Sequence, residues 1–135
     1  MAKPLKRRIR SVCVYCGSSS RGPARHRRDA IRLGQTLAAA GVDLVYGGGH
    51  VGLMGLMADA ALSAGGRVTG VIPADLIKKE VGYGKVTRLV VTKSMHARKM
   101  AMFKRSDAFV VLPGGPGTLD EFFEVLTWRQ LRFHD

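Results

Sequence analysis

The chain has 135 residues, 46% of them hydrophobic, which suits one domain with a core of its own and argues against a disordered polypeptide. No apolar run reaches the ~20 residues of a membrane helix, so no membrane partner is expected. Nine of the 22 lysines and arginines behind the net charge of +12 lie in residues 1–10 and 21–28, without interleaved aromatic residues. We therefore expect a solvated basic face that attracts nucleic acid only non-specifically.

The N-terminal residues 1–8 are expected to form a flexible basic tail, and residues 9–135 a single nucleotide-binding, catalytic domain. The tail lacks the apolar core and the cleavage site of a signal peptide. A cytoplasmic location is therefore the expectation.

The first predicted strand, residues 10–16, contains both cysteines, Cys13 and Cys16. A C-x-x-C pair can be a redox or zinc motif, but redox pairs open a helix, and residues three apart in a strand point to opposite faces. The sequence has no second cysteine pair to complete a zinc site. We interpret both as small core residues, and no metal is expected.

Apolar runs and helical patterns alternate along the rest of the chain. Further strands are predicted at 42–46, 67–72, 86–91 and 108–112, and helices at 23–40, 53–64, 94–104 and 118–131. The segment 74–85 is less regular. This alternation predicts an α/β fold, a doubly wound parallel sheet of about five strands. Ligands of such sheets bind beyond the carboxyl ends of the strands at the topological switch point, where the turns after the first, second and fifth strands should meet.

The turn after the second strand, Gly47-x-Gly49-x-x-Gly52, matches the dinucleotide fingerprint by letter. It follows the second strand rather than the first, and Ile72-Pro73-Ala74 stands where an acidic residue would be needed. We expect these glycines to let the backbone approach a mononucleotide and a neighbouring turn, and no cofactor is expected. His50 in this turn, like His96 later, is expected to be an ordinary residue.

The helix after the fourth strand begins at Ser94 and carries two cations among methionines on one stripe, Met95, Arg98, Lys99 and Met102. One interpretation is a solvated face whose cations extend along apolar surface. The other is that Arg98 reaches into the cleft, because a guanidinium suits phosphate and ribose oxygens.

The fifth strand runs into the glycine-rich turn Gly114-Gly115-Pro116-Gly117-Thr118, and a helical pattern follows. Unpaired N–H groups and a positive helix dipole make such a turn suitable for a phosphate or carboxylate. Thr118 is a plausible N-cap, and Thr118-x-x-Glu121 has the spacing of a capping box. Glu121 is therefore either a structural cap or a carboxylate that acts on a bound ligand.

Four segments together resemble the Lonely Guy (LOG) family, once labelled lysine decarboxylases. The motif P-G-G-x-G-T-x-x-E is present at 113–121, and M-H-x-R-K at 95–99. The glycine segment 46–55 and the segment 124–128 are similar to further family motifs. Pro116 departs from the family, which usually has Tyr or Gly there; proline fixes φ and lacks an N–H donor.

The resemblance implies a Rossmann-like homodimer that cleaves the N-glycosidic bond of cytokinin riboside 5′-monophosphates, and often of AMP, to free base and ribose 5-phosphate. It implies that Arg98 and Glu121 are the catalytic residues. The relatives continue through further strand–helix units, so C-terminal units of the family are expected to be missing from this chain. Substrate contacts are expected at Ser18, Gly48, Gly49, Glu80, Met95, Lys99, Gly114, Gly115, Gly117, Thr118 and Thr127.

Two alternatives of other classes stay open. The chain could be a non-catalytic carrier of a nucleotide or of the molybdenum cofactor, although binding alone does not need the carboxylate of Glu121. It could also be a pyridoxal phosphate decarboxylase, which would need a Schiff-base lysine such as Lys99.

Overall fold

A computed structural model describes residues 8–17 and 22–131. Nearly all of the predicted basic tail, and the predicted site residue Ser18, lie outside these described residues. Within them, no helix is both long enough and apolar enough to cross a membrane.

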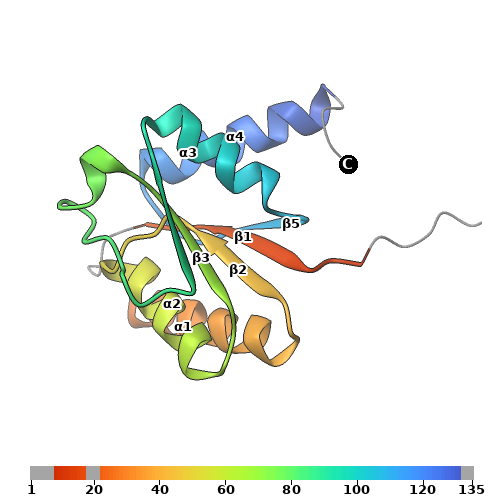
Figure 1. Ribbon diagram of the computed structural model, residues 1–135. Coiled ribbons are helices and arrows are strands. Elements are labelled where there is room, and N and C mark those ends of the chain that lie inside the picture. Colours follow the sequence, from red (N-terminus) through yellow and green to blue (C-terminus); the bar gives the residue numbers. More distant parts are fainter. Residues whose placement is uncertain (1–7, 18–21, 132–135) are drawn as a thin grey trace, which may run out of the picture.

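Five parallel strands form one sheet in the order β4-β3-β2-β1-β5, which confirms the predicted α/β fold (Figure 1). Each strand is a short run rich in valine and other β-formers, and the inner strands are buried, as expected for a parallel sheet covered on both faces. The strands are β1 (Ser11–Tyr15), β2 (Asp43–Tyr46), β3 (Val68–Pro73), β4 (Arg88–Thr92) and β5 (Ala108–Val111).

In the described part of the chain, the helices α1 to α4 cover the two faces of the sheet (Figure 1). On one face α1 (Ala24–Ala39) packs beside α2 (Gly52–Ser63), and on the other lie α3 (Met95–Lys104) and α4 (Pro116–Gln130). Only a 3₁₀ turn, η1 (Ala74–Leu76), and an irregular segment join β3 to β4.

Each face of the sheet has its own apolar core. Tyr46 belongs to the core beneath α1 and α2, and Met102 to the core beneath α3 and α4. Cys13 lies in the second core and Cys16 packs against the first, so the two thiols point to opposite faces as predicted. Both are free, and burial raises the pKa of each thiol to about 12, which keeps them protonated.

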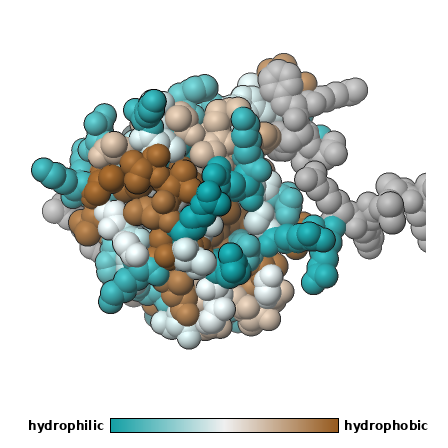
Figure 2. Space-filling view, viewed as in Figure 1, coloured by the Kyte–Doolittle hydropathy of each residue, from teal (hydrophilic) through white to brown (hydrophobic). Residues whose placement is uncertain are grey.

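The surface is not uniformly polar. Figure 2 shows a hydrophobic area surrounded by hydrophilic side chains on the side turned to the viewer. Large apolar side chains are also exposed along α4. These are Leu119, Phe122, Phe123 and Leu126, with Leu131 at the end of the helix.

Candidate active site

The switch point of the sheet lies between β1 and β5, because the strand order runs outward from β1 to β4 and resumes on the other side of β1. A pocket opens at the carboxyl ends of these strands. Gly17, Gly47 and Gly115 all line it, so the turns after the first, second and fifth strands meet as predicted. The first and last of these turns are joined by a hydrogen bond from the Gly17 N–H to the Pro113 carbonyl (3.1 Å).

Arg98 projects from the first turns of α3 into this pocket, and its side chain is buried, with only 4% of the residue exposed. Ser94 caps the helix as predicted, its hydroxyl accepting from the Ala97 N–H at 3.0 Å. The interpretation of Arg98 as a solvated cation is therefore wrong.

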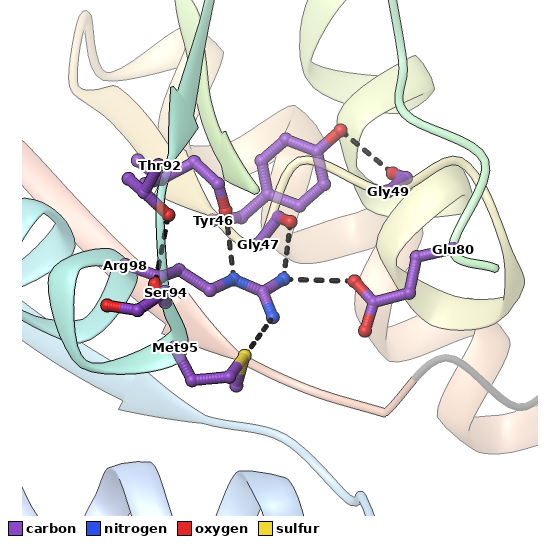
Figure 3. Close-up of polar contacts among 9 residues, drawn as sticks. Tyr46, Gly47, Gly49, Glu80, Thr92, Ser94, Met95 and Arg98 are labelled. Atoms are coloured by element: carbon purple, nitrogen blue, oxygen red, sulfur yellow. Dashed lines mark hydrogen bonds and ion pairs between the residues drawn. The ribbon is translucent and has the colours of Figure 1, made fainter. Parts of the chain in front are cut away.

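Three acceptors hold the Arg98 guanidinium in place (Figure 3). Its Nε donates to the Val71 carbonyl at 2.9 Å, and its Nη2 donates to the Gly47 carbonyl at 2.5 Å and to Glu80 Oε2 at 3.0 Å. Its Nη1 contacts the sulfur of Met95 at 3.8 Å, a weak acceptor. Among the described residues, Nη1 thus has no oxygen partner, and its protons are available to an anionic ligand.

The glycines after β2 leave room for the Arg98 guanidinium and for the segment that carries Glu80. A Cβ at Gly47 would overlap the Arg98 guanidinium, and a Cβ at Gly49 would lie 2.8 Å from the Glu80 carbonyl oxygen. Within the chain, Arg98 and the Glu80 segment are the groups that approach this loop closely, and the approach of a mononucleotide stays a prediction.

The segment that carries Glu80 is pinned to this glycine loop through its backbone. The His50 N–H donates to the carbonyls of Glu80 (3.0 Å) and Val81 (2.8 Å), and the Tyr83 N–H donates to the Gly48 carbonyl (2.9 Å). Gly49 and Gly82 form an isolated antiparallel bridge. These contacts bring the Glu80 carboxylate, only 17% exposed, into the pocket from an irregular segment.

The capping of α4 differs from the prediction. The N-cap is Gly115, Pro116 is the first helical residue, and no side chain caps the helix. Thr118 therefore lies inside the first turn, and the predicted Thr118 cap and capping box are wrong. Pro116 occupies the one helical position where a fixed φ and a missing N–H cost least, so its helix starts two residues earlier than expected.

Glu121 lies one turn further along α4 and lines the same pocket as Arg98. Burial raises the pKa of its carboxyl to about 7, with a further contribution from the nearby Glu80, although Arg98 acts in the opposite direction. A carboxyl group that changes charge near neutral pH, in a pocket with an arginine, is a candidate acid or base.

The remaining predicted site residues fall into two groups. Met95, Gly115 and Thr118 line the pocket with Glu80, Arg98 and Glu121. In the same turn, Gly114 precedes Gly115 and Gly117 follows Pro116. The others do not line it. Gly48 (φ +77°) and Gly49 lie in the loop behind Arg98, and the exposed Thr127 donates its hydroxyl to the Phe123 carbonyl at 2.7 Å.

Lys99 is not among the residues that line the pocket, and its side chain joins α3 to α4. Its Nζ lies 2.5 Å from Glu124 and 3.1 Å from Asp120, and the hydrogen bond to Glu124 is the main reason its pKa is raised. A Schiff-base lysine must lose its proton, so this ion-paired ammonium does not fit a pyridoxal phosphate site.

Several pocket-lining residues were missed from the sequence. Cys16 directly follows β1 at the switch point, and that position was the available signal, whereas Gly17 belongs to a turn that was expected there. Met54 comes from α2, and nothing in its periodicity sets it apart from its apolar neighbours. No three side chains in the described ranges are grouped so that they could hold a metal ion.

Comparison with known proteins identifies the family. The sequence model of the family described as "Possible lysine decarboxylase" matches residues 54–135. The protein named "Probable cytokinin riboside 5'-monophosphate phosphoribohydrolase LOGL9" from Oryza sativa subsp. japonica is 54% identical over 127 residues. The chain belongs to the Lonely Guy (LOG) family.

Relatives in the LOG family are longer than this chain. The alignment with the rice protein covers 94% of this chain but 56% of the relative. Cytokinin riboside 5′-monophosphate phosphoribohydrolase LOG1 of Arabidopsis thaliana is 45% identical over 131 residues, which are 97% of this chain and 62% of that protein.

Solved structures of related proteins share the LOG fold seen here. The Moco carrier protein of Chlamydomonas reinhardtii superimposes with a TM-score of 0.76 at 26% identity, covering 90% of this chain and 73% of that one. The molybdenum cofactor binding protein of Rippkaea orientalis gives 0.75 at 27% identity, covering 91% and 74%.

Proposed function

We propose that this protein is an N-glycosyl hydrolase that releases the free base and ribose 5-phosphate from cytokinin riboside 5′-monophosphates, AMP or both. The observation that carries the proposal is one pocket that joins a buried arginine, a carboxyl group titrating near pH 7 and a glycine turn at a helix N-terminus. The names of the close relatives support the same activity. A cytoplasmic location is part of the proposal.

In the proposed reaction the oxygen of water adds to C1′ of the ribose, and the bond from C1′ to the base breaks. The electron pair of that bond leaves with the base, which takes up a proton. The carboxylate of Glu121 stabilises the positive charge that develops on the ribose and accepts a proton from water. A pKa of about 7 makes this carboxylate a stronger base than an ordinary one and leaves about half of it ionised at pH 7.

The 5′-phosphate is assigned to the turn at the start of α4. Pro116 has no N–H, and the Thr118 N–H already donates to the Gly115 carbonyl at 3.1 Å, so the phosphate would be bound by the other amides of the turn. The helix dipole favours an anion at this end of α4. The unused Nη1 donors of Arg98 face the same pocket and supply a fixed positive charge. The substrate would thus be held by its phosphate while its glycosidic bond lies beside Glu121.

The direct test is a screen of nucleoside 5′-monophosphates, with released base and ribose 5-phosphate separated by chromatography. The proposal expects both products in equal amounts from AMP or an N6-substituted AMP. Binding of nucleotides without product would contradict it.

A second candidate function is that of a carrier of the molybdenum cofactor, favoured by the similarity to solved carrier structures. Such a carrier binds without turnover. Tight binding of the cofactor by a chain that releases no base would favour this function.

We also include a homodimer in the proposal. The exposed apolar side chains of α4 would be covered by the same helix of a second copy. An isolated exposed apolar residue needs no such cover, but several of them lie together on this helix. Trp128 and Val125 point inward and pack within the chain, Trp128 edge-on to Phe103, so the candidate interface is the remaining face of the helix.

A further inference from the structure

Three side chains outside the pocket form one connected group, which we call the Asp59 cluster: His50, Asp59 and Tyr83. Tyr83 donates its hydroxyl to Asp59 Oδ1 in a short hydrogen bond, and His50 Nε2 lies 3.1 Å from Asp59 Oδ2. The rings of His50 and Tyr83 stack with centroids 3.9 Å apart. Three elements are thereby joined: the glycine loop, α2 and the irregular segment before β4.

The electrostatics of the Asp59 cluster match this geometry. Burial alone would raise the pKa of Asp59, but hydrogen bonds from Tyr83 and His50 reverse this and lower it. The hydrogen bond to Asp59 raises the pKa of the Tyr83 phenol. Asp59 and His50 are 45% and 41% exposed, and a lone exposed pair would contribute little. Ring stacking and the phenolic hydrogen bond add to this pair, so the three groups act together.

The position of the cluster relates it to the pocket. His50 and Tyr83 are the two residues whose backbone N–H groups pin the Glu80 segment to the glycine loop. Their side chains bond to Asp59 and so add a second connection between the glycine loop and the Glu80 segment. The Glu80 carboxylate itself bonds to Arg98 Nη2. A Cβ at Gly55 would lie 2.7 Å from the His50 carbonyl carbon, so the start of α2 packs directly against the His50 backbone.

We propose that the Asp59 cluster positions the Glu80 carboxylate against Arg98, so that His50, Asp59 and Tyr83 are positioning residues for the reaction; this inference rests on the proposed function. Without the cluster, the hydrogen bonds described between this segment and the loop are backbone bonds alone. The ion pair between Glu80 and Arg98 is then formed for a smaller fraction of the time. Glu80 is the only carboxylate partner of this guanidinium among the described residues.

The variants Tyr83→Phe and Asp59→Asn test this in the full chain, because each keeps its shape and removes one hydrogen bond or charge. Asp75→Asn, an exposed aspartate at the start of the same segment, is the matched control. Hydrogen exchange at the amides of His50 and Tyr83 should become about 3–10-fold faster in the two cluster variants, and stay unchanged in the control.

The second measurement is kcat/KM for base release in a double-mutant cycle with Glu80→Gln. Tyr83→Phe should lower kcat/KM about 3–10-fold on its own and have no further effect when Glu80 is already Gln. Unchanged exchange, or an equal loss in both backgrounds, would overturn the inference. If the wild type releases no base from any nucleoside monophosphate, the proposed function fails, and the exchange measurement alone decides whether the cluster holds the segment.

Discussion

Glu121 is subject to two opposing influences within one pocket. Burial and the neighbouring Glu80 favour its neutral form, while Arg98 favours its charged form, and the net result is a pKa of about 7. If the ionised carboxylate stabilises the transition state, the reaction must depend on pH through this group.

We therefore expect kcat/KM to rise with pH below about 7, by about tenfold per unit, and to level off above it. A pH series of initial rates with wild-type protein measures this. A profile that falls through the same range would make Glu121 a proton donor instead.

The same carboxyl should affect stability with a defined sign. Its pKa is about 7 in the folded chain and near 4.5 without these surroundings, so between these values the folded state holds more protons. The free energy of unfolding should fall as pH rises from about 4.5 to 7. Urea unfolding should show this slope in the wild type and a weaker one in Glu121→Gln, which cannot ionise; equal slopes would contradict the burial of this charge.

At the scale of elements, how much could be predicted depended on whether the signal was local. The cap of α3 was correct because Ser94 acts on its own first turn. The start of α4 was missed because two sequence patterns compete there. Thr118-x-x-Glu121 and the pair Gly115-Pro116 are each typical of a helix N-terminus, and only packing decides between them. The role of Glu80 came from family resemblance alone, because its segment has no periodicity and docks on glycines far earlier in the sequence.

The contact between the Glu80 segment and the glycine loop predicts the effect of adding one methyl group at Gly49. Gly49→Ala would place its Cβ 2.8 Å from the Glu80 carbonyl oxygen and from the Met54 side chain. We expect a loss of about 1–3 kcal/mol in unfolding free energy and a reduced kcat/KM, since the Glu80 segment must shift. Thermal unfolding and kinetics check this. Gly84→Ala, with open space around its Cβ, is the control and should differ little from wild type.

The turn at the start of α4 predicts the substrate class. Because it is assigned to the 5′-phosphate, adenosine should be cleaved at least about 100-fold less efficiently than AMP, the effect of losing two charged hydrogen bonds. Paired assays of the two compounds decide this. Equal efficiency with the two compounds would contradict the assignment of the 5′-phosphate to Gly115, Gly117 and Thr118.

At the scale of the whole molecule, α4 carries more exposed large apolar side chains than any other helix or strand of the described residues. Four large apolar side chains along it are between 37% and 58% exposed, whereas the basic residues of α1 lie on the opposite face of the sheet. Association of two copies through α4 would leave the basic surface in water.

Light scattering across a concentration series should therefore give about twice the chain mass of 14.6 kDa. Phe123→Glu, at the most exposed of these positions, should shift the protein towards the monomer without unfolding it. A monomer at every concentration in the wild type would contradict the proposed dimer.

In the proposed reaction this pocket breaks a glycosidic bond, and the carboxylate of Glu121 takes part. The most direct measurement compares wild type with Glu121→Gln for release of base from AMP or an N6-substituted AMP, together with nucleotide affinity by calorimetry. We predict that the variant binds the nucleotide and that its kcat falls by about 10²–10⁴-fold. Base release at the wild-type rate by Glu121→Gln, or nucleotide binding without any base release by the wild type, would contradict the account.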